Sequence, residues 1–309
     1  MSDSDKKPNS DAAGWIGLFD SGYGGLTIFK EISHQLPQYS YIYFGDNARA
    51  PYGSRQPEEI YQHTITGVEY LFSQGAQLVI LACNTASAVA LRRLQQEWLP
   101  RLHPDKKVLG IIVPTIEQIT GVSWRNSENW KLKIENSPAQ TSALVLGVLA
   151  TPQTVASKAY EHEIHKRNSN IKVYQQACPG LVKAIEDNSS QQNINKILQN
   201  CITSLRGQLF PKKSGAAIST SEKISLLLGC THYELVADQI HSLLPESVTL
   251  YEQPKIVAAK LADYLNRHSA IATSLDKTGQ RRFVTSGDPQ KVSAQAAKFW
   301  GEPIQFTKA

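Results

Sequence analysis

Short apolar runs alternate with longer amphipathic stretches from Trp15 onward, and this alternation constrains the fold more than any other feature of the chain. Runs such as Leu78–Leu81 and Ile224–Leu228 are almost continuously aliphatic. Strands of a parallel sheet have this composition because helices cover both faces of the sheet. The pattern therefore predicts an α/β fold with mainly parallel sheets flanked by helices.

The predicted strands fall into two series with later additions. The first series comprises Trp15–Asp20, Tyr41–Asp46, Leu78–Cys83 and Val108–Val113. The second series comprises Ala143–Ala150, Ile171–Cys178 and Lys223–Cys230, followed by Val248–Tyr251 and Arg282–Ser286. The clearest helical stretches are Pro57–Ser73, Ala86–Trp98 and Pro254–Arg267. Polar composition predicts a disordered tail over residues 1–13, an insertion or interdomain loop over Val122–Thr141 and a flexible connector over Pro211–Glu222.

Composition narrows the class of protein. The 309 residues are enough for two domains of ordinary size, and 41% hydrophobic with 19% charged residues is typical of a folded globular chain. The sequence has no apolar run of about 20 residues and begins with a polar segment, so we expect a cytoplasmic protein that does not enter a membrane. The net charge of +5 is spread along the chain, whereas nucleic-acid binders cluster their basic residues, so nucleic acid is not expected as a partner.

The chain has four cysteines and no CxxC pair, so we expect free thiols. Cys178 and Cys201 are interpreted as small buried apolar residues. Cys83 and Cys230 differ from them, because each follows an apolar strand and precedes polar residues that resemble the start of a helix. Ligands of α/β sheets bind at the carboxyl ends of strands, so both of these thiols are predicted to lie where chemistry usually occurs.

The chemistry of two such thiols is specific. A helix N-terminus carries partial positive charge, which stabilises a thiolate, the form of cysteine that removes protons. His232 adds a titratable group two residues after Cys230. Two bases on opposite faces of a carbon can invert its configuration, because one removes a proton while the other donates one. Cys83 and Cys230 are therefore candidates for a pair of acid/base groups.

The loop Asp20–Gly25 follows the first predicted strand, and its backbone N–H groups could bind a carboxylate or a phosphate. The Asp20 carboxylate could orient an ammonium group or a nearby thiol. An alternative is a dinucleotide-binding loop, since Asp46 ends the next strand. Against it, Thr27 replaces the third glycine of that motif, and Asp20 would repel a pyrophosphate.

Two further segments are candidates for sites. Pro51-Tyr52-Gly53-Ser54 follows Asp46 and could offer backbone donors to a ligand, although such a segment is often only a turn. His162-Glu-Ile-His165 lacks the spacing of a zinc motif and is interpreted as an exposed helical charge cluster. No metal site is therefore predicted.

Taken together, the motifs resemble those of the glutamate racemases of bacterial cell-wall synthesis, within the aspartate/glutamate racemase family. The resemblance runs in order from about residue 14 to 290. The matching segments are Gly17–Leu26, Tyr43–Asp46, Pro51–Gly53, Ala82–Ala86, Ala150–Ser157, Cys178-Pro179 with Glu186, Gly229–Tyr233 and Ser286–Asp288.

The resemblance implies two similar α/β domains with the active site in the cleft between them. It implies a first domain of residues 14–113 plus 254–309 and a second domain of residues 114–253, with crossings after Val113 and near Gln253. It also implies that no cofactor is used, that the substrate is L- or D-glutamate, that D-glutamate is supplied for peptidoglycan, and that the chain forms a homodimer.

Catalytic roles also follow from the resemblance. Cys83 would remove the α-proton of D-glutamate with the help of Asp20, and Cys230 that of L-glutamate with the help of His232 supported by Glu186. The implied substrate-binding residues are Asp20, Ser21, Pro51, Tyr52, Gly53, Asn84, Thr85, Thr231 and His232.

Three departures from the family pattern stand out: Glu234 in place of proline, Val113-Pro114-Thr115 in place of Glu-Pro-Gly, and Arg55 in place of lysine. None removes a predicted catalytic group. Two alternatives remain open at this point, namely a related aspartate racemase and a catalytically inactive amino-acid-binding regulatory protein.

Overall fold

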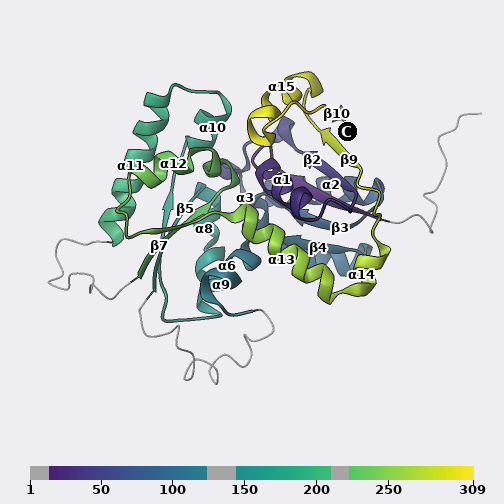
Figure 1. Cartoon of the computed structure of the whole chain (residues 1–309), viewed down its shortest axis with the longest axis horizontal. Helices are drawn as coiled ribbons and strands as arrows, with labels where there is room; N and C mark the ends of the chain where they lie inside the picture. The colour runs from purple at the N-terminus through teal and green to yellow at the C-terminus, as the bar shows by residue number, and fades with distance from the viewer. Residues whose placement is uncertain (1–13, 124–143, 210–222) are drawn as a thin grey trace, which may run out of the picture.

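A computed structural model describes residues 14–123, 144–209 and 223–309. Its strands form two sheets that lie side by side, one of six strands and one of four (Figure 1). Every strand pair in both sheets is parallel. The expectation of an α/β fold with mainly parallel sheets is thus confirmed. The predicted tail and connector lie outside the described residues, as does the predicted insertion beyond Ser123.

The six-stranded sheet has the order β10-β9-β2-β1-β3-β4. Its strands are β1 (Trp15–Asp20), β2 (Tyr41–Gly45), β3 (Ala76–Leu81), β4 (Lys107–Gly110), β9 (Arg281–Thr285) and β10 (Thr307–Lys308). Because β1 lies centrally between β2 and β3, the carboxyl ends of these three strands are adjacent.

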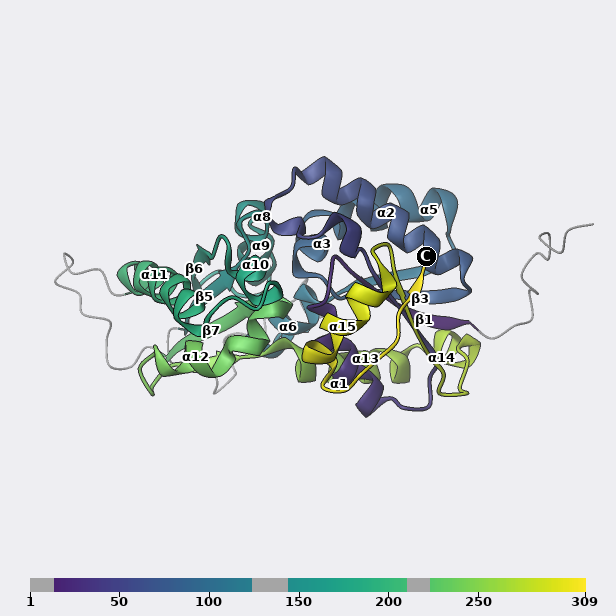
Figure 2. The same ribbon diagram turned by 90° about the horizontal axis from the view of Figure 1, so that it is seen from above.

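Helices cover both faces of this sheet (Figure 2). On one face lie α1 (Gly25–Gln35), α13 (Gln253–Arg267), α14 (Ser269–Ser274) and α15 (Pro289–Trp300), and on the other lie α2 (Pro57–Ser73) and α3 (Asn84–Val89). The buried side chains of β1 alternate accordingly. Ile16 and Leu18 join the cluster under α1 and α13, whereas Phe19 packs with the residues of α2. This alternation follows from the two-residue period of a strand.

The four-stranded sheet has the order β6-β5-β7-β8, built from β5 (Leu144–Ala150), β6 (Lys172–Ala177), β7 (Lys223–Gly229) and β8 (Thr249–Tyr251). One face packs on α11 (Gln191–Leu209), with α10 (Leu181–Glu186) and α12 (Ala237–Ser242) beside it. The other face packs on α6 (Ile112–Thr120) and α9 (Ala159–His165), which bury Ile116 and Ile164 against Leu146. The short helix α8 (Pro152–Ser157) follows β5 and contacts α3 of the larger unit.

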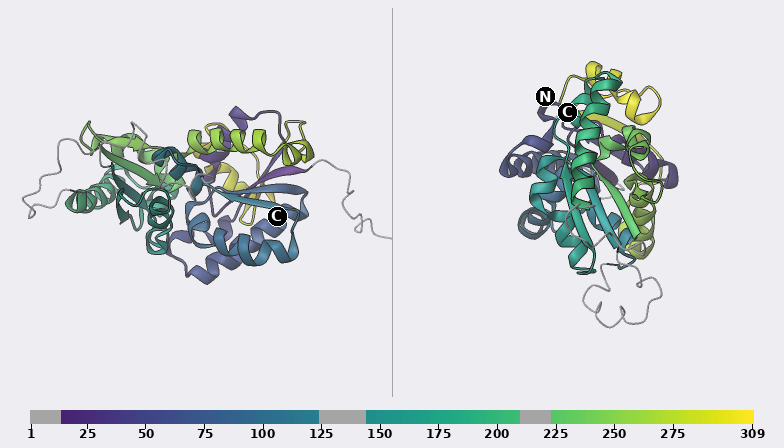
Figure 3. Two further views of the ribbon diagram at one scale, coloured as in Figure 1. Left: turned by 90° about the horizontal axis from the view of Figure 1, so that it is seen from below. Right: turned by 90° about the vertical axis from the view of Figure 1, so that its left-hand side faces the viewer.

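The chain passes between the two sheets twice. It leaves the six-stranded sheet through α6 and returns at the first residue of α13. From there α13 runs from the junction of the sheets along the larger one (Figures 1 and 3). Both crossings therefore lie close to the carboxyl ends of the strands that carry the two cysteines of interest.

Most predicted elements match the structure within two residues, and β1 and α2 match at both ends. The predicted strand Val108–Val113 is wrong at its end, because α6 already begins at Ile112. Hydrophobic character alone does not separate a buried strand from the buried first turn of a helix, and here two isoleucines and a valine continue across the boundary.

The predicted helix Ala86–Trp98 begins earlier and is interrupted. It starts at Asn84 as α3 and continues through α4 (Leu91–Arg93), a π-helical turn (η3, Leu94–Trp98) and α5 (Leu99–Leu102). Proline has no N–H to donate to the preceding turn, so Pro100 explains why the helix is irregular just before it. Three short 3₁₀ helices, η1 (Asn47–Arg49), η2 (Tyr52–Ser54) and η6 (Thr231–Val236), complete the described elements near the strand ends.

Candidate active site

The strand ends of the two sheets face each other at one junction. A side chain on Gly24, after β1, would bring its Cβ within 2.3 Å of Thr231 Oγ1 and 2.5 Å of His232 Nδ1, both after β7. Likewise, a Cβ on Gly53 would lie 2.7 Å from that of Thr151, which follows β5. Glycine is therefore required at both positions because the loops of the two units are in contact there.

Cys83 follows β3 and caps the N-terminus of α3. Its Sγ accepts a hydrogen bond from the backbone N–H of Ala86 at 3.4 Å and lies 3.3 Å from Ser21 Oγ. The thiol is only 6% exposed. Burial and the nearby charges of Asp20 and Cys230 raise the pKa of Cys83 to about 12, against the opposing effect of Ser21 and the helix N–H group. The expected helix start is present, yet the thiol form is favoured.

Asp20 ends β1 and is almost completely buried. Its Oδ2 accepts from the N–H of Gly22 at 2.9 Å and from the hydroxyl of Tyr43 at 3.2 Å. Burial raises the pKa of Asp20, and the charge of His232 acts in the opposite direction. The other oxygen, Oδ1, makes no hydrogen bond of ordinary geometry within the described residues, although the N–H of Gly25 lies near enough to favour the charged form.

Cys230 follows β7 and is 5% exposed. Its Sγ lies 3.9 Å from His232 Nδ1, and Nε2 on the other side of that ring lies 2.7 Å from Glu186 Oε1. Burial disfavours the imidazolium, but the contacts with Cys230 and Glu186 outweigh it and raise the pKa of His232 to about 10. The helix after Cys230 is the 3₁₀ helix η6, and the sulfur makes no capping hydrogen bond there.

The loop after β2 is held by Asp46, which is fully buried. Its carboxylate accepts from Tyr52 OH at 2.6 Å, Ser286 Oγ at 2.6 Å and Arg49 Nη1 at 3.0 Å. These contacts bring Tyr52 and Gly53 to the junction, while Pro51 is exposed. The three groups already occupy this carboxylate. It is therefore not available to bind a ribose hydroxyl, as the dinucleotide-binding alternative would require.

The remaining predicted binding residues also converge on the junction. Thr85 Oγ1 lies 2.9 Å from Thr151 Oγ1 and 3.3 Å from Thr154 Oγ1. Thr231 is buried beside Gly24. The side-chain amide of Asn84 is held by protein groups at both ends, with Nδ2 donating to another side chain at 2.7 Å and Oδ1 accepting at 2.5 Å.

Three residues of this arrangement lie in segments that match the family, but sequence reasoning assigned none of them a catalytic or binding role. Tyr43 donates to Asp20, and Thr151 and Thr154 form a hydroxyl cluster with Thr85. Thr151 follows the predicted strand Ala143–Ala150, so the rule that ligands bind at carboxyl ends of strands would have found it. Tyr43 gives no such signal, because its position inside β2 is that of an ordinary core aromatic residue.

No protein-family model matches the chain. A glutamate racemase from Phenylobacterium zucineum (strain HLK1) is 40% identical over 299 residues, which covers 95% of this chain and 99% of the relative. A glutamate racemase from Caulobacter sp. (strain K31) is 41% identical over 301 residues, with the same shares covered. The chain belongs to the glutamate racemase family.

Solved glutamate racemases have the same fold. Isoform RacE1 from Bacillus anthracis superimposes with a TM-score of 0.75 at 28% identity, covering 96% of this chain and 97% of that one. The enzyme from Francisella tularensis, solved in complex with D-glutamate, gives a TM-score of 0.75 at 27% identity with the same coverage. The similarity extends over both sheets, so it includes the junction between them.

The three departures from the racemase pattern lie at or near this junction. Glu234 is half-buried, and its Oε1 accepts from the backbone N–H of Gln253 at 3.1 Å. Burial raises the pKa of Glu234 to about 8. Thr115 lies on α6, and its Oγ1 accepts from Gln253 Nε2 at 3.0 Å. Arg55 donates through Nε to the carbonyl of Arg49 at 2.6 Å, so it stabilises the loop that follows β2.

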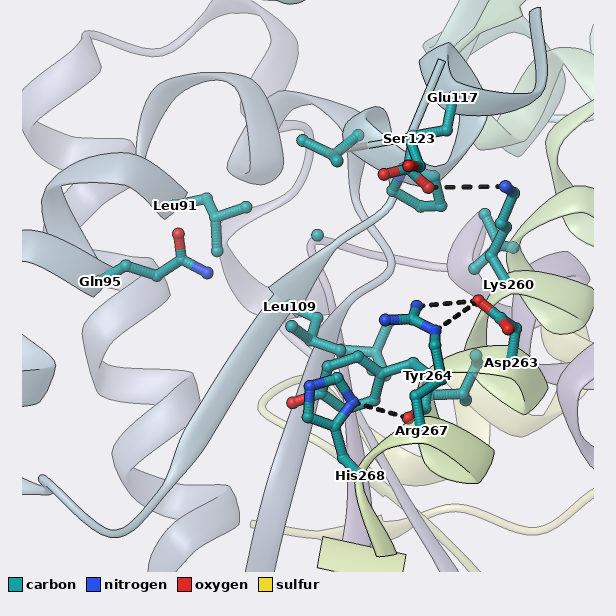
Figure 4. Close-up of a pocket in the computed structure, with 16 residues that line it drawn as sticks. Leu91, Gln95, Leu109, Glu117, Ser123, Lys260, Asp263, Tyr264, Arg267 and His268 are labelled. Atoms are coloured by element: carbon teal, nitrogen blue, oxygen red, sulfur yellow. Dashed lines mark hydrogen bonds and ion pairs between the residues drawn. The ribbon is translucent and has the colours of Figure 1, made fainter. Parts of the chain in front are cut away.

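A pocket of about 660 Å³ lies behind this junction, between β4, α6 and α13 (Figure 4). Val113 and Pro114 of the outgoing crossing contribute to its lining. Glu117 and Lys260 form an ion pair of 3.5 Å at one end of it. None of the predicted catalytic or substrate-binding residues of this racemase-family chain lines the pocket.

Two other sequence features can be checked within the described residues. The pair His162 and His165 lies on α9, as expected for a helical cluster, but only His162 is exposed. His165 is half-buried and its Nε2 contacts the carbonyl of Ile171 at 3.2 Å. In the described ranges no three metal-binding side chains come together, and no helix there is both long and apolar enough to cross a membrane.

Proposed function

We propose that this chain is a cofactor-independent glutamate racemase that interconverts L- and D-glutamate. The observation that carries the proposal is that two buried strand-end thiols, Cys83 and Cys230, lie at one junction between the sheets, where the loop after β1 contacts both Cys83 and the residues that follow Cys230. Thiols presented from two separate sheets can reach opposite faces of one carbon, which is what inversion by two bases requires.

In the proposed reaction one cysteine acts as a base and the other as an acid. Starting from L-glutamate, the Cys230 thiolate takes the α-proton, and the Cys83 thiol gives its own proton to the opposite face. The product is D-glutamate, with Cys230 now a thiol and Cys83 a thiolate. The reverse direction starts from this second state, so Cys83 removes the α-proton of D-glutamate. No group other than the two thiols needs to accept or donate the transferred protons.

The neighbours of each thiol support this assignment. His232 Nδ1 lies 3.9 Å from the Cys230 sulfur, and the contacts with Cys230 and Glu186 raise the pKa of this imidazole to about 10, so a cation lies beside Cys230. Asp20 favours the protonated form of Cys83 and can also attract the substrate ammonium group. Cys83 would therefore start as the acid, which is its role in the direction that begins with L-glutamate.

Backbone and hydroxyl groups around the thiols are proposed to bind the substrate. Free N–H groups at the start of α3 and in the loop after β1 suit carboxylates. We assign this role to the residues that line the junction, namely Asp20, Ser21, Pro51, Tyr52, Gly53, Asn84, Thr85, Thr231 and His232.

Proposals about the domains, the cellular location, the assembly and the use of the product rest on the same family relationship. We propose that residues 14–113 with 254–309 and residues 114–253 are two domains with the active site between them. We further propose that the chain acts in the cytoplasm as a homodimer, and that its product is D-glutamate for peptidoglycan. Size measurement in solution tests the homodimer directly.

The activity is tested by incubating the purified protein with L-glutamate in D₂O without added cofactor. Optical rotation and α-deuterium content are followed together. We expect rotation to be lost while deuterium enters the inverted product. Faster racemisation of aspartate than of glutamate would instead indicate a related aspartate racemase. Glutamate binding without any α-exchange would indicate an inactive binding protein, and the proposed activity would then be wrong.

A further inference from the structure

Gln253 lies where the chain returns from the four-stranded sheet to the six-stranded one. It is the first residue of α13, two residues after β8 ends. Its side chain is 0% exposed, which is unusual for a glutamine. A buried amide is costly unless its donors and its acceptor all have partners, so the contacts of this residue indicate what holds it in place.

The amide of Gln253 closes a ring of hydrogen bonds with two other buried side chains. Its Oε1 accepts from Asn84 Nδ2 at 2.7 Å, and its Nε2 donates to Tyr160 OH at 3.2 Å. The same hydroxyl donates to Asn84 Oδ1 at 2.5 Å. Nε2 also donates to Thr115 Oγ1 at 3.0 Å. Each group in the ring acts once as donor and once as acceptor, so all of these bonds form together.

The ring connects parts of the chain that are far apart in sequence. Asn84 directly follows Cys83, Thr115 lies on the outgoing crossing, and Tyr160 lies on α9 beside the four-stranded sheet. The backbone N–H of Gln253 adds a further connection, because it donates to Glu234 Oε1 at 3.1 Å. Glu234 belongs to η6, the helix that begins directly after Cys230.

We infer that Gln253 is a positioning residue that fixes the segment after Cys83 relative to the segment after Cys230. Its side chain binds the first segment and its backbone binds the second. It therefore sets the placement of the two thiols on either side of the substrate carbon. The expected effect on kcat rests on the proposed racemase function. The connection that Gln253 makes between the two segments does not.

Two-base inversion is sensitive to this placement, because both proton transfers depend on the same separation of the thiols. A displacement of about 1 Å at a reacting group can cost about 10²-fold in rate. Substrate binding depends on it less, since backbone donors on each side hold the carboxylates separately. Loss of Gln253 should therefore lower kcat more than it changes KM.

The test compares Gln253→Met and Gln253→Glu with a matched control. Methionine keeps the length of the side chain but removes all of its hydrogen bonds, and glutamate keeps the shape but removes the donors to Thr115 and Tyr160. The control is Ser40→Ala, which removes a fully buried hydroxyl that contacts Thr278 at 3.0 Å beside the amino end of β2. Thermal unfolding of each variant shows that it is folded.

We expect kcat for racemisation to fall about 10- to 100-fold in both Gln253 variants while KM changes less than about 5-fold. Ser40→Ala should leave kcat within about 2-fold of wild type. Tyr160→Phe removes only the tyrosine hydroxyl from the ring of hydrogen bonds. It therefore provides a milder variant if the Gln253 substitutions do not fold. Its effect should combine less than additively with that of Gln253→Met, as groups in one network do.

A second readout does not depend on the substrate. Amide hydrogen exchange should accelerate in residues 84–89 of Gln253→Met, because the side chain of Gln253 holds Asn84, and it should stay unchanged there in Ser40→Ala. Folded Gln253 variants with wild-type kcat and unchanged exchange would overturn the inference. If the wild type fails to racemise glutamate but exchange still rises in residues 84–89 of Gln253→Met, the proposed function is wrong and the connection stands.

Discussion

Cys83 and Cys230 follow the same kind of strand and are buried to the same extent, yet their charged neighbours have opposite signs. Burial and the nearby Asp20 raise the pKa of the Cys83 thiol. His232 lies beside Cys230, and its contacts with Cys230 and Glu186 raise the pKa of its imidazole to about 10. Similar strand ends thus place an acidic group beside one thiol and a cationic group beside the other.

In the proposed mechanism, this difference would let two chemically identical groups begin the reaction in different protonation states. If both surroundings carried the same charge, both thiols would tend to be protonated or both would tend to be deprotonated. The pair would then lack either the base that removes the α-proton or the acid that donates one to the opposite face. The asymmetry is local, since it comes from side chains within four residues of a strand end and from one carboxylate on α10.

The largest expected effect comes from removing either thiol. Cys83→Ser and Cys230→Ser should each lower kcat for glutamate racemisation by at least about 10³-fold in both directions, because serine is far too weak an acid to replace cysteine. Polarimetry from each enantiomer measures this. The matched control is Cys201→Ser on α11, which should remain active. Full activity in either of the first two variants would contradict the assignment of two bases.

A smaller effect should follow from removing the carboxylate of Glu186, which contacts His232 beside Cys230. Glu186→Gln lowers the pKa of His232, so its cation is lost at a lower pH than in the wild type. We expect kcat to fall about 10-fold and the decline of activity on the alkaline side to move to lower pH. A pH–rate profile measures both changes. An alkaline side that does not move would show that His232 does not control the Cys230 side.

Much of this arrangement could be predicted from local sequence signals. Continuous aliphatic composition identified β3 and β7, and the polar residues after each cysteine placed both thiols at strand ends. The cap that Cys83 makes on α3 also follows from the polar residues after it. These signals are sufficient because they depend on neighbours within a few positions.

The remaining features depend on contacts between distant residues. Neither the spacing nor the composition around Gln253 indicates that it meets Asn84 and Tyr160, since a glutamine at a helix start is usually exposed. The pairing of His232 with Glu186 came from the family resemblance, because α10 and β7 are separated by the whole of α11. The sign of each thiol's environment could be assigned only once these residues had been brought together.

An effect on stability, and not on activity, is expected on the Cys230 side. Burial raises the pKa of Glu234 to about 8, above its ordinary value of 4.5. The folded state therefore holds a proton that the unfolded state releases, so stability declines as pH rises from about 4.5 to about 8 and stays low above that. Glu234→Gln removes this cost, which amounts to about 1.4 kcal/mol for each pKa unit.

Thermal unfolding at several pH values measures this effect. The Tm of Glu234→Gln should exceed that of the wild type most clearly at and above about pH 8, and the difference should shrink toward about pH 5. Glu246→Gln, at an exposed position, is the control and should show no such trend. A Tm difference that is constant with pH would contradict the burial of an ionisable carboxyl at this position.

The most direct test of the central claim is the rate of alkylation of the two thiols in the unliganded wild type between about pH 6 and about pH 10. Mass spectrometry of the peptides that contain Cys83 and Cys230 resolves the two reactions. Only thiolates react, and the two side chains are equally buried, so the rates compare their charge states. We expect the Cys83 peptide to stay largely unmodified up to about pH 10, because burial and the charge of Asp20 raise the pKa of this thiol to about 12. Modification of Cys83 near neutral pH in the folded protein would contradict the account.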